Sequence, residues 1–297
     1  MPRAWLIAGG HGTLGSALAA ALADRGAVCE APGAGELDIT DGDRVAERVA
    51  RLAAECEQRG VAGVVVNAAA YTDVEAAEDD EDAAFRVNAT GPGYLARACE
   101  GHDLRFVHVS TDFVFDGSKD GAYSEDDEPR PLSVYGASKL AGERSVLEAC
   151  PDALVVRTAW LFGPPQAGFP ARIIEIARGR DSIRVVDDER GSPTYAPDLA
   201  EGIVALVNAG ATGVVHLAGS GDCNRHELAV ESLRLAGLGT RVDPVSSAEF
   251  PTRARRPANS VLDCGKAAGY GVRLRDWRES LAEFVANDLH AGAGERS

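Results

Sequence analysis

Short apolar runs alternate with longer amphipathic stretches along most of the chain. The apolar runs are rich in β-branched residues and show little polar alternation, at residues 5–8, 63–66, 106–109, 154–156 and 214–217. The stretches between them are rich in Ala, Leu, Arg and Glu, at residues 14–25, 43–59, 82–100, 135–150 and 197–208. Apolar strands separated by helices are typical of a parallel sheet covered on both faces. The pattern predicts a doubly wound α/β fold, in which ligands bind at the carboxyl ends of the strands.

The regular alternation ends after about residue 159, where Gly and Pro residues punctuate shorter elements. It returns once, over residues 197–217, and the chain ends in a small polar tail at 291–297. We therefore expect a sheet-bearing domain over residues 1–158 with a return segment at about 196–222. Residues 159–195 and 223–297 are expected to form a smaller C-terminal α/β substrate lobe.

The net charge limits the partners. The chain has 30 Lys and Arg against 46 Asp and Glu, a formal charge of −16. Such a surface repels polyanions, which argues against nucleic acid or an anionic membrane as a bulk partner. An anionic small molecule would have to meet a locally positive pocket.

Two further features favour a cytoplasmic protein. No apolar run approaches the roughly 20 residues needed to span a bilayer, and the first run stops at Gly9, too early for a signal peptide. The six cysteines lie far apart, with no C-x-x-C motif and no Cys/His cluster. Reduced thiols, rather than disulfides or a metal site, are expected.

A glycine-rich turn follows the first predicted strand. Glycines 10, 12 and 15 fit the pattern G-x-G-x-x-G, and glycines 9, 12 and 15 fit G-x-x-G-x-x-G. Glycine is required where the backbone turns tightly and approaches a pyrophosphate at a helix N-terminus. A plain strand–helix connection could use the same residues, but this position at the start of the chain favours a dinucleotide site. It would be formed by Gly9, Gly12, Thr13, Leu14 and Gly15.

The second predicted strand bears on the choice of dinucleotide. An acidic ribose ligand usually ends this strand, yet Gly33 occupies the expected position and Glu30 lies earlier. The missing carboxylate removes repulsion against a 2′-phosphate, but no arginine follows at once to bind one. NADPH and NADH both stay open, with a slight preference for NADPH.

Tyr135 and Lys139 are four residues apart at a predicted helix start, which places them on one helix face. A free phenol has a pKa of about 10, and a nearby ammonium would lower it and make Tyr135 a usable acid or base. A chance alignment of a surface Tyr and Lys is equally compatible with this spacing alone. The strand at 106–109, however, ends in Ser110, Thr111 and Asp112, where a hydroxyl could bind a substrate carbonyl. Although Ser-Thr-Asp alone could be a simple turn, the three motifs in this order are much more specific.

At this point the chain resembles the extended short-chain dehydrogenase/reductase superfamily, and more narrowly the dTDP-4-dehydrorhamnose reductase family. The matching segments run nearly end to end, at residues 9–15, 36–41, 67–72, 74–78, 87–89, 110–117, 134–143, 157–160, 191–200 and 256–260. The last three separate this family from generic nucleotide-sugar epimerases. The resemblance implies a Rossmann domain and reduction of the C4 ketone of a dTDP-6-deoxy-4-ketohexose by hydride from a nicotinamide.

The resemblance also implies roles for single residues. The family's catalytic positions are occupied by Thr111, Tyr135 and Lys139. Cofactor contacts would include Tyr135 and Lys139 together with Asp38, Ile39, Ala68, Ala69 and Ala70. Positions near the substrate are occupied by Val74, Thr111, Asp112, Trp160 and Arg256. For Trp160, an ordinary core aromatic is an equal alternative.

Two details refine these expectations. Related 4,6-dehydratases follow the Thr-Asp pair with a glutamate, whereas this chain has Phe113, which cannot transfer a proton. Carbonyl reduction is therefore favoured over elimination. Arginine suits phosphate oxygens, and within the basic cluster Arg256 is the expected diphosphate ligand, while Arg253 and Arg255 are expected in a solvated loop.

Three alternatives stay open from the sequence. The substrate could be another nucleotide 4-keto sugar of natural-product biosynthesis. The chain could also be a non-catalytic NADP-binding regulatory subunit, although the intact Thr111, Tyr135 and Lys139 argue against this. The sequence does not fix the oligomeric state, and a homodimer is compatible with it.

Overall fold

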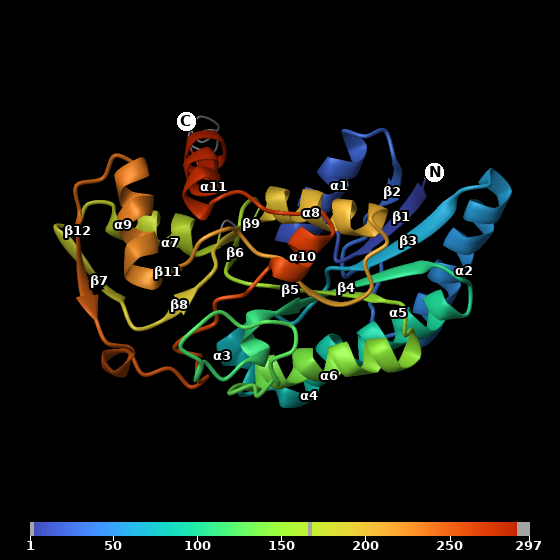
Figure 1. Cartoon of the computed structure of the whole chain (residues 1–297), viewed down its shortest axis with the longest axis horizontal. Coiled ribbons are helices and arrows are strands. Elements are labelled where there is room, and N and C mark those ends of the chain that lie inside the picture. Colours follow the sequence, from blue (N-terminus) through green and yellow to red (C-terminus); the bar gives the residue numbers. More distant parts are fainter. Residues whose placement is uncertain (1–2, 166–167, 290–297) are drawn as a thin grey trace.

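Six parallel strands form the central sheet of the computed structural model, which describes residues 3–165 and 168–289 (Figure 1). The strand order is β10-β5-β4-β3-β1-β2, and every neighbouring pair is parallel. The strands are β1 (Arg3–Ala8), β2 (Val28–Glu30), β3 (Ala62–Asn67), β4 (Arg105–Thr111), β5 (Leu154–Thr158) and β10 (Gly213–His216). The predicted doubly wound α/β fold is confirmed. The polar tail at 291–297 lies outside the described residues.

Helices cover both faces of this sheet, as Figure 1 shows. One face carries α1 (Thr13–Ala23) and α8 (Ala196–Asn208), and the other carries α2 (Gly42–Arg59), α5 (Gly91–Glu100) and α6 (Val134–Ala149). Successive residues of β1 alternate between the two cores: Trp5 and Ile7 pack toward α1 and α8, and Leu6 packs toward α2 and α5. This double burial explains why the strand sequences show no polar alternation.

The remaining elements gather beside the sheet, at the left in Figure 1. They include α7 (Gly168–Ala177), α9 (Arg225–Leu235), α11 (Trp277–Phe284) and the parallel pair β7 (Ser182–Val186) and β12 (Arg241–Val245). Two-residue strands pair as β6 (Leu161–Phe162) with β9 (Thr194–Tyr195), and as β8 (Arg190–Gly191) with β11 (Cys223–Asn224). These elements share a core of their own, built around Phe162, Trp277 and Phe284.

The helix predicted over residues 82–100 is confirmed as an unbroken helical course, part of which is π-helical. After α3 (Val74–Ala77), the chain forms α4 (Glu81–Phe85), a π-helical turn (Arg86–Thr90) and then α5. Pro92 has no N–H to continue the helical ladder, and it stands in the first turn of α5. The π turn, a form common at functional sites, also brings Asn88 into the interior, where its side chain bonds the backbone of Tyr71 through both amide atoms.

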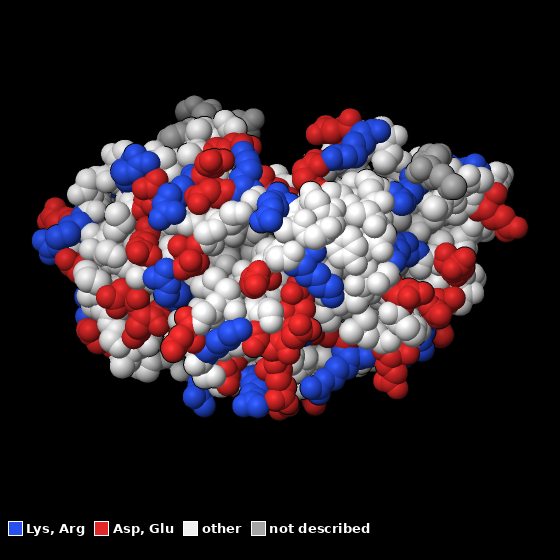
Figure 2. Space-filling view, viewed as in Figure 1, with Lys and Arg blue, Asp and Glu red and all other residues white. Residues whose placement is uncertain are grey.

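The remaining short elements are helical turns. They are α10 (Gly265–Gly269), the 3₁₀ turns Asp112–Val114 and Ser247–Glu249, and a π turn at Val285–Leu289. In the part of the chain that the structure describes, no helix is long and apolar enough to cross a membrane. Figure 2 shows acidic and basic side chains interspersed over the visible face, with an area poor in charge where α8 and α10 lie.

Candidate active site

The glycine-rich turn packs backbone against backbone at the carboxyl end of the sheet. Gly9 has φ +79°, and a Cβ on it would lie 2.6 Å from the amide nitrogen of Ala69. A Cβ on Gly15 would lie 2.7 Å from the Cα of Gly10. Only glycine allows this turn, and it brings the predicted cofactor contacts after β1 and after β3 together.

The N-terminus of α1 offers a positive dipole to an anion. Gly12 is the N-cap and has no side chain to bond the first-turn amides, and the first turn contains no acidic residue. The chain thus leaves the positive end of the dipole without a counter-charge of its own in this turn, as a pyrophosphate site requires. Together with the glycine cradle, this geometry fits a dinucleotide.

The segment after β2 places a carboxylate beside that turn, since Glu36 Oε2 lies 3.5 Å from Nε2 of His11. Glu30 is paired with Arg48 and Arg51. A Cβ on Gly33 would run into the His11 ring, so a side chain at the expected carboxylate position would require that ring to move. The amide of Gly33 donates to Glu36 at 2.9 Å.

Asp38 and Ile39 follow Glu36 in the chain. Asp38 accepts hydrogen bonds from the amide and hydroxyl of Thr40, which lower its pKa. The Ile39 side chain is buried in the core, close to Gly91.

The start of α6 rests directly on the turn that follows β4. Ser133 caps the helix by accepting from the amide of Gly136 at 3.2 Å, and Glu78 accepts from the amide of Val134 at 2.8 Å. A Cβ on Gly136 would collide with the carbonyl oxygen of Phe113. The glycine between Tyr135 and Lys139 therefore permits the close approach that brings α6 to β4.

Lys139 and Tyr135 both face the end of β4. The Lys139 side chain is buried, and its Nζ donates to the carbonyl oxygen of Val109 at 2.6 Å. Burial lowers the pKa of Lys139 to about 8, and the charge of Glu143 opposes this effect. Tyr135 is half-buried and packs edge-on against Phe113, with ring centroids 5.6 Å apart.

The pKa of Tyr135 differs from the expectation of an ammonium-lowered phenol. Burial raises it to about 12, a hydrogen bond with Thr111 lowers it, and the charge of Asp112 raises it. Desolvation of the phenolate outweighs the other effects because the ring packs within the protein. The Lys139 ammonium is meanwhile engaged by the carbonyl of Val109.

Asp112 lies between the Thr111 hydroxyl and residues of the C-terminal part of the chain, Arg225 and Ser260. Its Oδ1 accepts from the Thr111 hydroxyl at 3.0 Å. Its Oδ2 is buried and has no hydrogen-bond partner among residues 3–165 and 168–289 by geometry. Burial raises the pKa of Asp112 to about 6, while Ser260, Thr111 and Arg225 act to lower it. A buried acceptor of this kind is suited to a ligand donor.

Arg225 lies beside Trp160 and Asp112, although no sequence motif predicts it there. It is the first residue of α9, and its guanidinium carbon lies 3.5 Å from the centroid of the Trp160 ring. Trp160 has φ +44°, and a Cβ on Gly191 would lie 2.5 Å from its indole nitrogen. Burial lowers the pKa of Arg225 to about 10, while Glu189 and Asp112 act to raise it. No local motif signals this position, because the stacking depends on how α9 meets the chain after β5.

The two remaining predicted substrate residues are Val74 and Arg256. Arg256 donates to Glu75 at 3.1 Å, and Glu75 directly follows Val74 at the start of α3. The charge of Arg256 also acts on Arg225. Arg253 is exposed and pairs with Asp79, in agreement with a solvated loop. Arg225 thus stacks on Trp160 and feels the charges of both Asp112 and Arg256.

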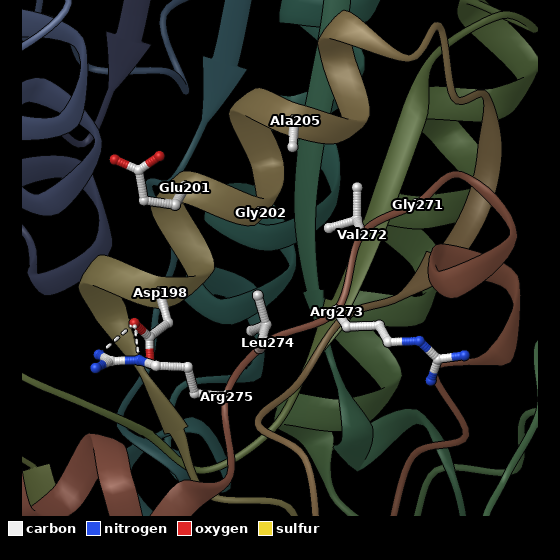
Figure 3. Close-up of a pocket in the computed structure, with 9 residues that line it drawn as sticks. All are labelled: Asp198, Glu201, Gly202, Ala205, Gly271, Val272, Arg273, Leu274 and Arg275. Atoms are coloured by element: carbon white, nitrogen blue, oxygen red, sulfur yellow. Dashed lines mark hydrogen bonds and ion pairs between the residues drawn. The ribbon is translucent and has the colours of Figure 1, made fainter.

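An open groove of about 360 Å³ lies elsewhere, along α8 (Figure 3). Its lining residues are Asp198, Glu201, Gly202, Ala205 and Gly271 to Arg275. Figure 3 shows Arg275 turned toward Asp198, with Arg273 extending away from that pair. The groove contains none of the predicted site residues, and α8 covers the face of the sheet opposite α6. Across the described residues, no cluster of His, Cys, Asp and Glu is arranged to hold a metal ion.

The chain is similar to known proteins over nearly its whole length. The family model described as "RmlD substrate binding domain" matches residues 3–289. The dTDP-4-dehydrorhamnose reductase of Mycobacterium tuberculosis H37Rv is 45% identical, covering 98% of this chain and 95% of that protein. A probable dTDP-4,6-dihydroxy-2-methyloxan-3-one 4-ketoreductase of Streptomyces antibioticus is 41% identical, covering 97% and 96%. The crystal structure of dTDP-4-dehydrorhamnose reductase from Bacillus anthracis in complex with NADP has a TM-score of 0.90 at 32% identity, covering 96% of this chain and 99% of that one.

Proposed function

Because this chain belongs to the dTDP-4-dehydrorhamnose reductase family, we propose that it reduces the C4 ketone of dTDP-4-dehydrorhamnose to give dTDP-rhamnose, with NADPH or NADH as the reductant. The observation that carries the proposal is the meeting of β4 and α6. The Thr111 hydroxyl lies near enough to Tyr135 to lower the pKa of that phenol, and Lys139 lies one turn further along the same helix. A carbonyl placed there would meet two hydroxyl groups and a nearby cation.

The cofactor site is proposed at the glycine cradle. Gly9, Gly12 and Gly15 would admit the pyrophosphate at the N-terminus of α1, together with Thr13 and Leu14. Asp38 and Ile39 would bound the adenosine end, and Ala68, Ala69 and Ala70 would line the path toward Tyr135 and Lys139. A bound nicotinamide supplies the hydride for C4.

Tyr135 is the proposed acid. A phenol with a pKa of about 12 is protonated at neutral pH, so it has a proton to give to the developing C4 alkoxide. Thr111, near Tyr135, would orient the carbonyl. Lys139 is mostly protonated at pH 7, and its positive charge would stabilise the phenolate left on Tyr135. Phe113, packed against Tyr135, can transfer no proton, so elimination of water is not expected.

The substrate side is proposed to run from Asp112 to Arg256. The free acceptor of Asp112 would take a sugar hydroxyl, and Trp160, stacked under Arg225, would wall the sugar site. Val74 and Arg256 would lie toward the nucleoside diphosphate. The positive charges of Arg225 and Arg256 would attract the diphosphate despite the negative net charge of the protein. We accordingly propose that residues 1–158 and 196–222 bind the cofactor and residues 159–195 and 223–297 supply the substrate lobe.

A second candidate is a 4-ketoreductase of another deoxysugar. It is favoured by the 41% identity to the Streptomyces antibioticus protein over 97% of this chain. The two candidates share the chemistry and differ in the sugar. A cytoplasmic location is also proposed, since the six cysteines are all free thiols in the structure.

The test is a reaction of the purified chain with dTDP-4-dehydrorhamnose and each nicotinamide cofactor. We expect the absorbance of the reduced nicotinamide to fall and the product to have the C4 configuration of rhamnose. The reaction should be somewhat faster with NADPH than with NADH. A product of the other C4 configuration would favour the second candidate. Tight NADPH binding without oxidation by any 4-keto sugar nucleotide would overturn the proposal in favour of a regulatory subunit.

A further inference from the structure

Glu143 lies one helical turn beyond Lys139 and faces the same strand. The Lys139 Nζ donates to the carbonyl oxygen of Val109, and Oε1 of Glu143 accepts from the hydroxyl of the next residue, Ser110. Thr111 follows in the strand and acts to lower the pKa of Tyr135 at the start of α6. Two consecutive residues of β4, Val109 and Ser110, are therefore each hydrogen-bonded to one residue of α6.

The Glu143 carboxylate is also held from the other side. Arg157 of β5 donates to it twice, from Nε at 2.9 Å and from Nη2 at 2.7 Å. The two side chains are only 3% and 4% exposed. The Nη1 of Arg157 lies 3.4 Å from Nε2 of His216. Burying two charges is costly, and an apolar pair of similar volume often gives equal stability. The pair thus calls for a role beyond holding the fold.

We propose that Glu143 is a positioning residue for the catalytic pair. With Ser110 and Arg157 it fixes the Tyr135–Lys139 face of α6 against the end of β4, and its carboxylate supplies the counter-charge of the buried Lys139 ammonium. The effect of Glu143 on turnover rests on the proposed function, whereas its effect on the Lys139 ammonium does not.

The charges around Lys139 support this role. Tyr135 and Glu143 face it from α6, His108 faces it from β4, and Arg157 of β5 lies behind Glu143. Burial and the Lys139 charge hold the pKa of His108 well below its usual range, so that ring is neutral. Glu143 is the group that raises the pKa of Lys139 against the effect of burial. Without the carboxylate, the ammonium would lose its proton at a lower pH.

The protonation of Lys139 can be measured without any substrate. The chain has only three lysines, Lys119, Lys139 and Lys266, so isotope-labelled lysine side chains can be followed by NMR as the pH is raised. Lys139 is expected to titrate near pH 8, and Lys119 and Lys266 serve as internal references. Glu143→Gln should lower the Lys139 pKa by about one unit or more.

A double variant separates this role from simple fold support. Glu143→Gln alone leaves Arg157 as a buried unpaired cation, so it can also fail to fold. Glu143→Met with Arg157→Met removes both charges and keeps apolar volume. The lower Lys139 pKa should persist in the double variant. Glu201→Gln, which removes an exposed carboxylate from Arg25, is the control and should leave the Lys139 pKa unchanged.

The pH profile of kcat gives the second readout. In the double variant, the alkaline limb should move to lower pH by the same amount as the NMR titration. Ser110→Ala keeps both charges, and should lower kcat up to about tenfold while KM and the Lys139 pKa stay unchanged. An unshifted Lys139 titration, or a uniform loss of kcat with an unmoved profile, would overturn the proposal. A wild-type chain that lacks reductase activity would refute the proposed function and leave the NMR result standing.

Discussion

The Lys139 ammonium is bonded to the backbone carbonyl of Val109 at 2.6 Å. This bond ties the fifth residue of β4 to the face of α6 that carries Tyr135, two residues before Thr111. The cation is therefore fixed by the sheet itself. In the proposed reaction, its position relative to Tyr135 is set before any ligand arrives, which limits the reorganisation needed in the transition state.

Replacing Tyr135 by Phe tests the proposed acid. Tyr135→Phe removes one hydroxyl and keeps the ring against Phe113, so the fold and NADPH binding should be unchanged. Turnover should fall by about 10²-fold or more, the contribution typical of general acid catalysis. Tyr270→Phe, at a partly exposed phenol after α10, is the matched control. Near-normal kcat in Tyr135→Phe would rule out the role.

Asp112→Asn should make the protein more stable and less active. The folded-state pKa of about 6 lies above the usual value of 3.8, so the folded state binds the proton more tightly. The contribution of Asp112 to stability is present at low pH and is lost as the pH rises through 6. At pH 7 the ionised carboxylate therefore lowers the free energy of unfolding by about 1–3 kcal/mol. Urea unfolding at pH 7 should show a gain of that order for the variant, which shrinks toward zero at about pH 4.

Activity provides the other half of that test. The Asn side chain offers one acceptor in place of the carboxylate, so KM for the sugar nucleotide should rise. A variant less stable than the wild type at pH 7, with the same difference at low pH, would contradict the buried-carboxylate account.

Three glycine variants separate folding from cofactor binding. Gly15→Ala would push a methyl group into the backbone of Gly9 and Gly10, so we expect a clear loss of stability. Gly12→Ala meets only the carbonyl oxygen of Gly9, at 3.4 Å. It should fold normally and bind NADPH about tenfold or more weakly, because the backbone could no longer approach the pyrophosphate closely.

Gly35→Ala is the control in that series, since its Cβ would meet nothing within 4 Å. Thermal melting and NADPH titration on all three variants provide the measurement. Wild-type NADPH affinity in Gly12→Ala would exclude this turn as the pyrophosphate site.

Arg225→Lys tests the residue that stacks on Trp160. Lysine keeps the charge but loses the planar guanidinium and its stacking, an exchange worth about 1 kcal/mol or more at a buried site. KM for the sugar nucleotide should rise about five- to tenfold with NADPH affinity unchanged. Arg234→Lys alters an exposed ion pair on the same helix and should have no effect. Equal effects of the two substitutions would remove Arg225 from the substrate site.

Local spacing explains which parts of this account the sequence could predict. The strand–glycine–helix turn and the Tyr135–Lys139 spacing are properties of short segments, and the alternating pattern was sufficient for the doubly wound sheet. The helical pattern over residues 82–100 was also sufficient for that helix, but it did not reveal the π turn at Arg86–Thr90.

Tertiary packing explains what was missed or wrong. The pKa of Tyr135 was expected to fall, and burial raises it, because desolvation depends on surrounding elements that no local pattern reports. Arg225 carries no motif, and the family-like segment at residues 87–89 does not report what Asn88 contacts. Arg225 meets Trp160 only after α9 packs, and Asn88 reaches Tyr71 only through the π turn.

The central claim, hydride transfer to C4 beside Tyr135, is tested most directly with NADPH that carries two deuterium atoms at C4 of the nicotinamide. After reaction with dTDP-4-dehydrorhamnose, NMR of the product sugar should show deuterium at C4 alone and the C4 configuration of rhamnose. Tyr135→Phe should give almost no labelled product. Deuterium retained entirely in the nicotinamide, or found at another carbon of the sugar, would contradict the account.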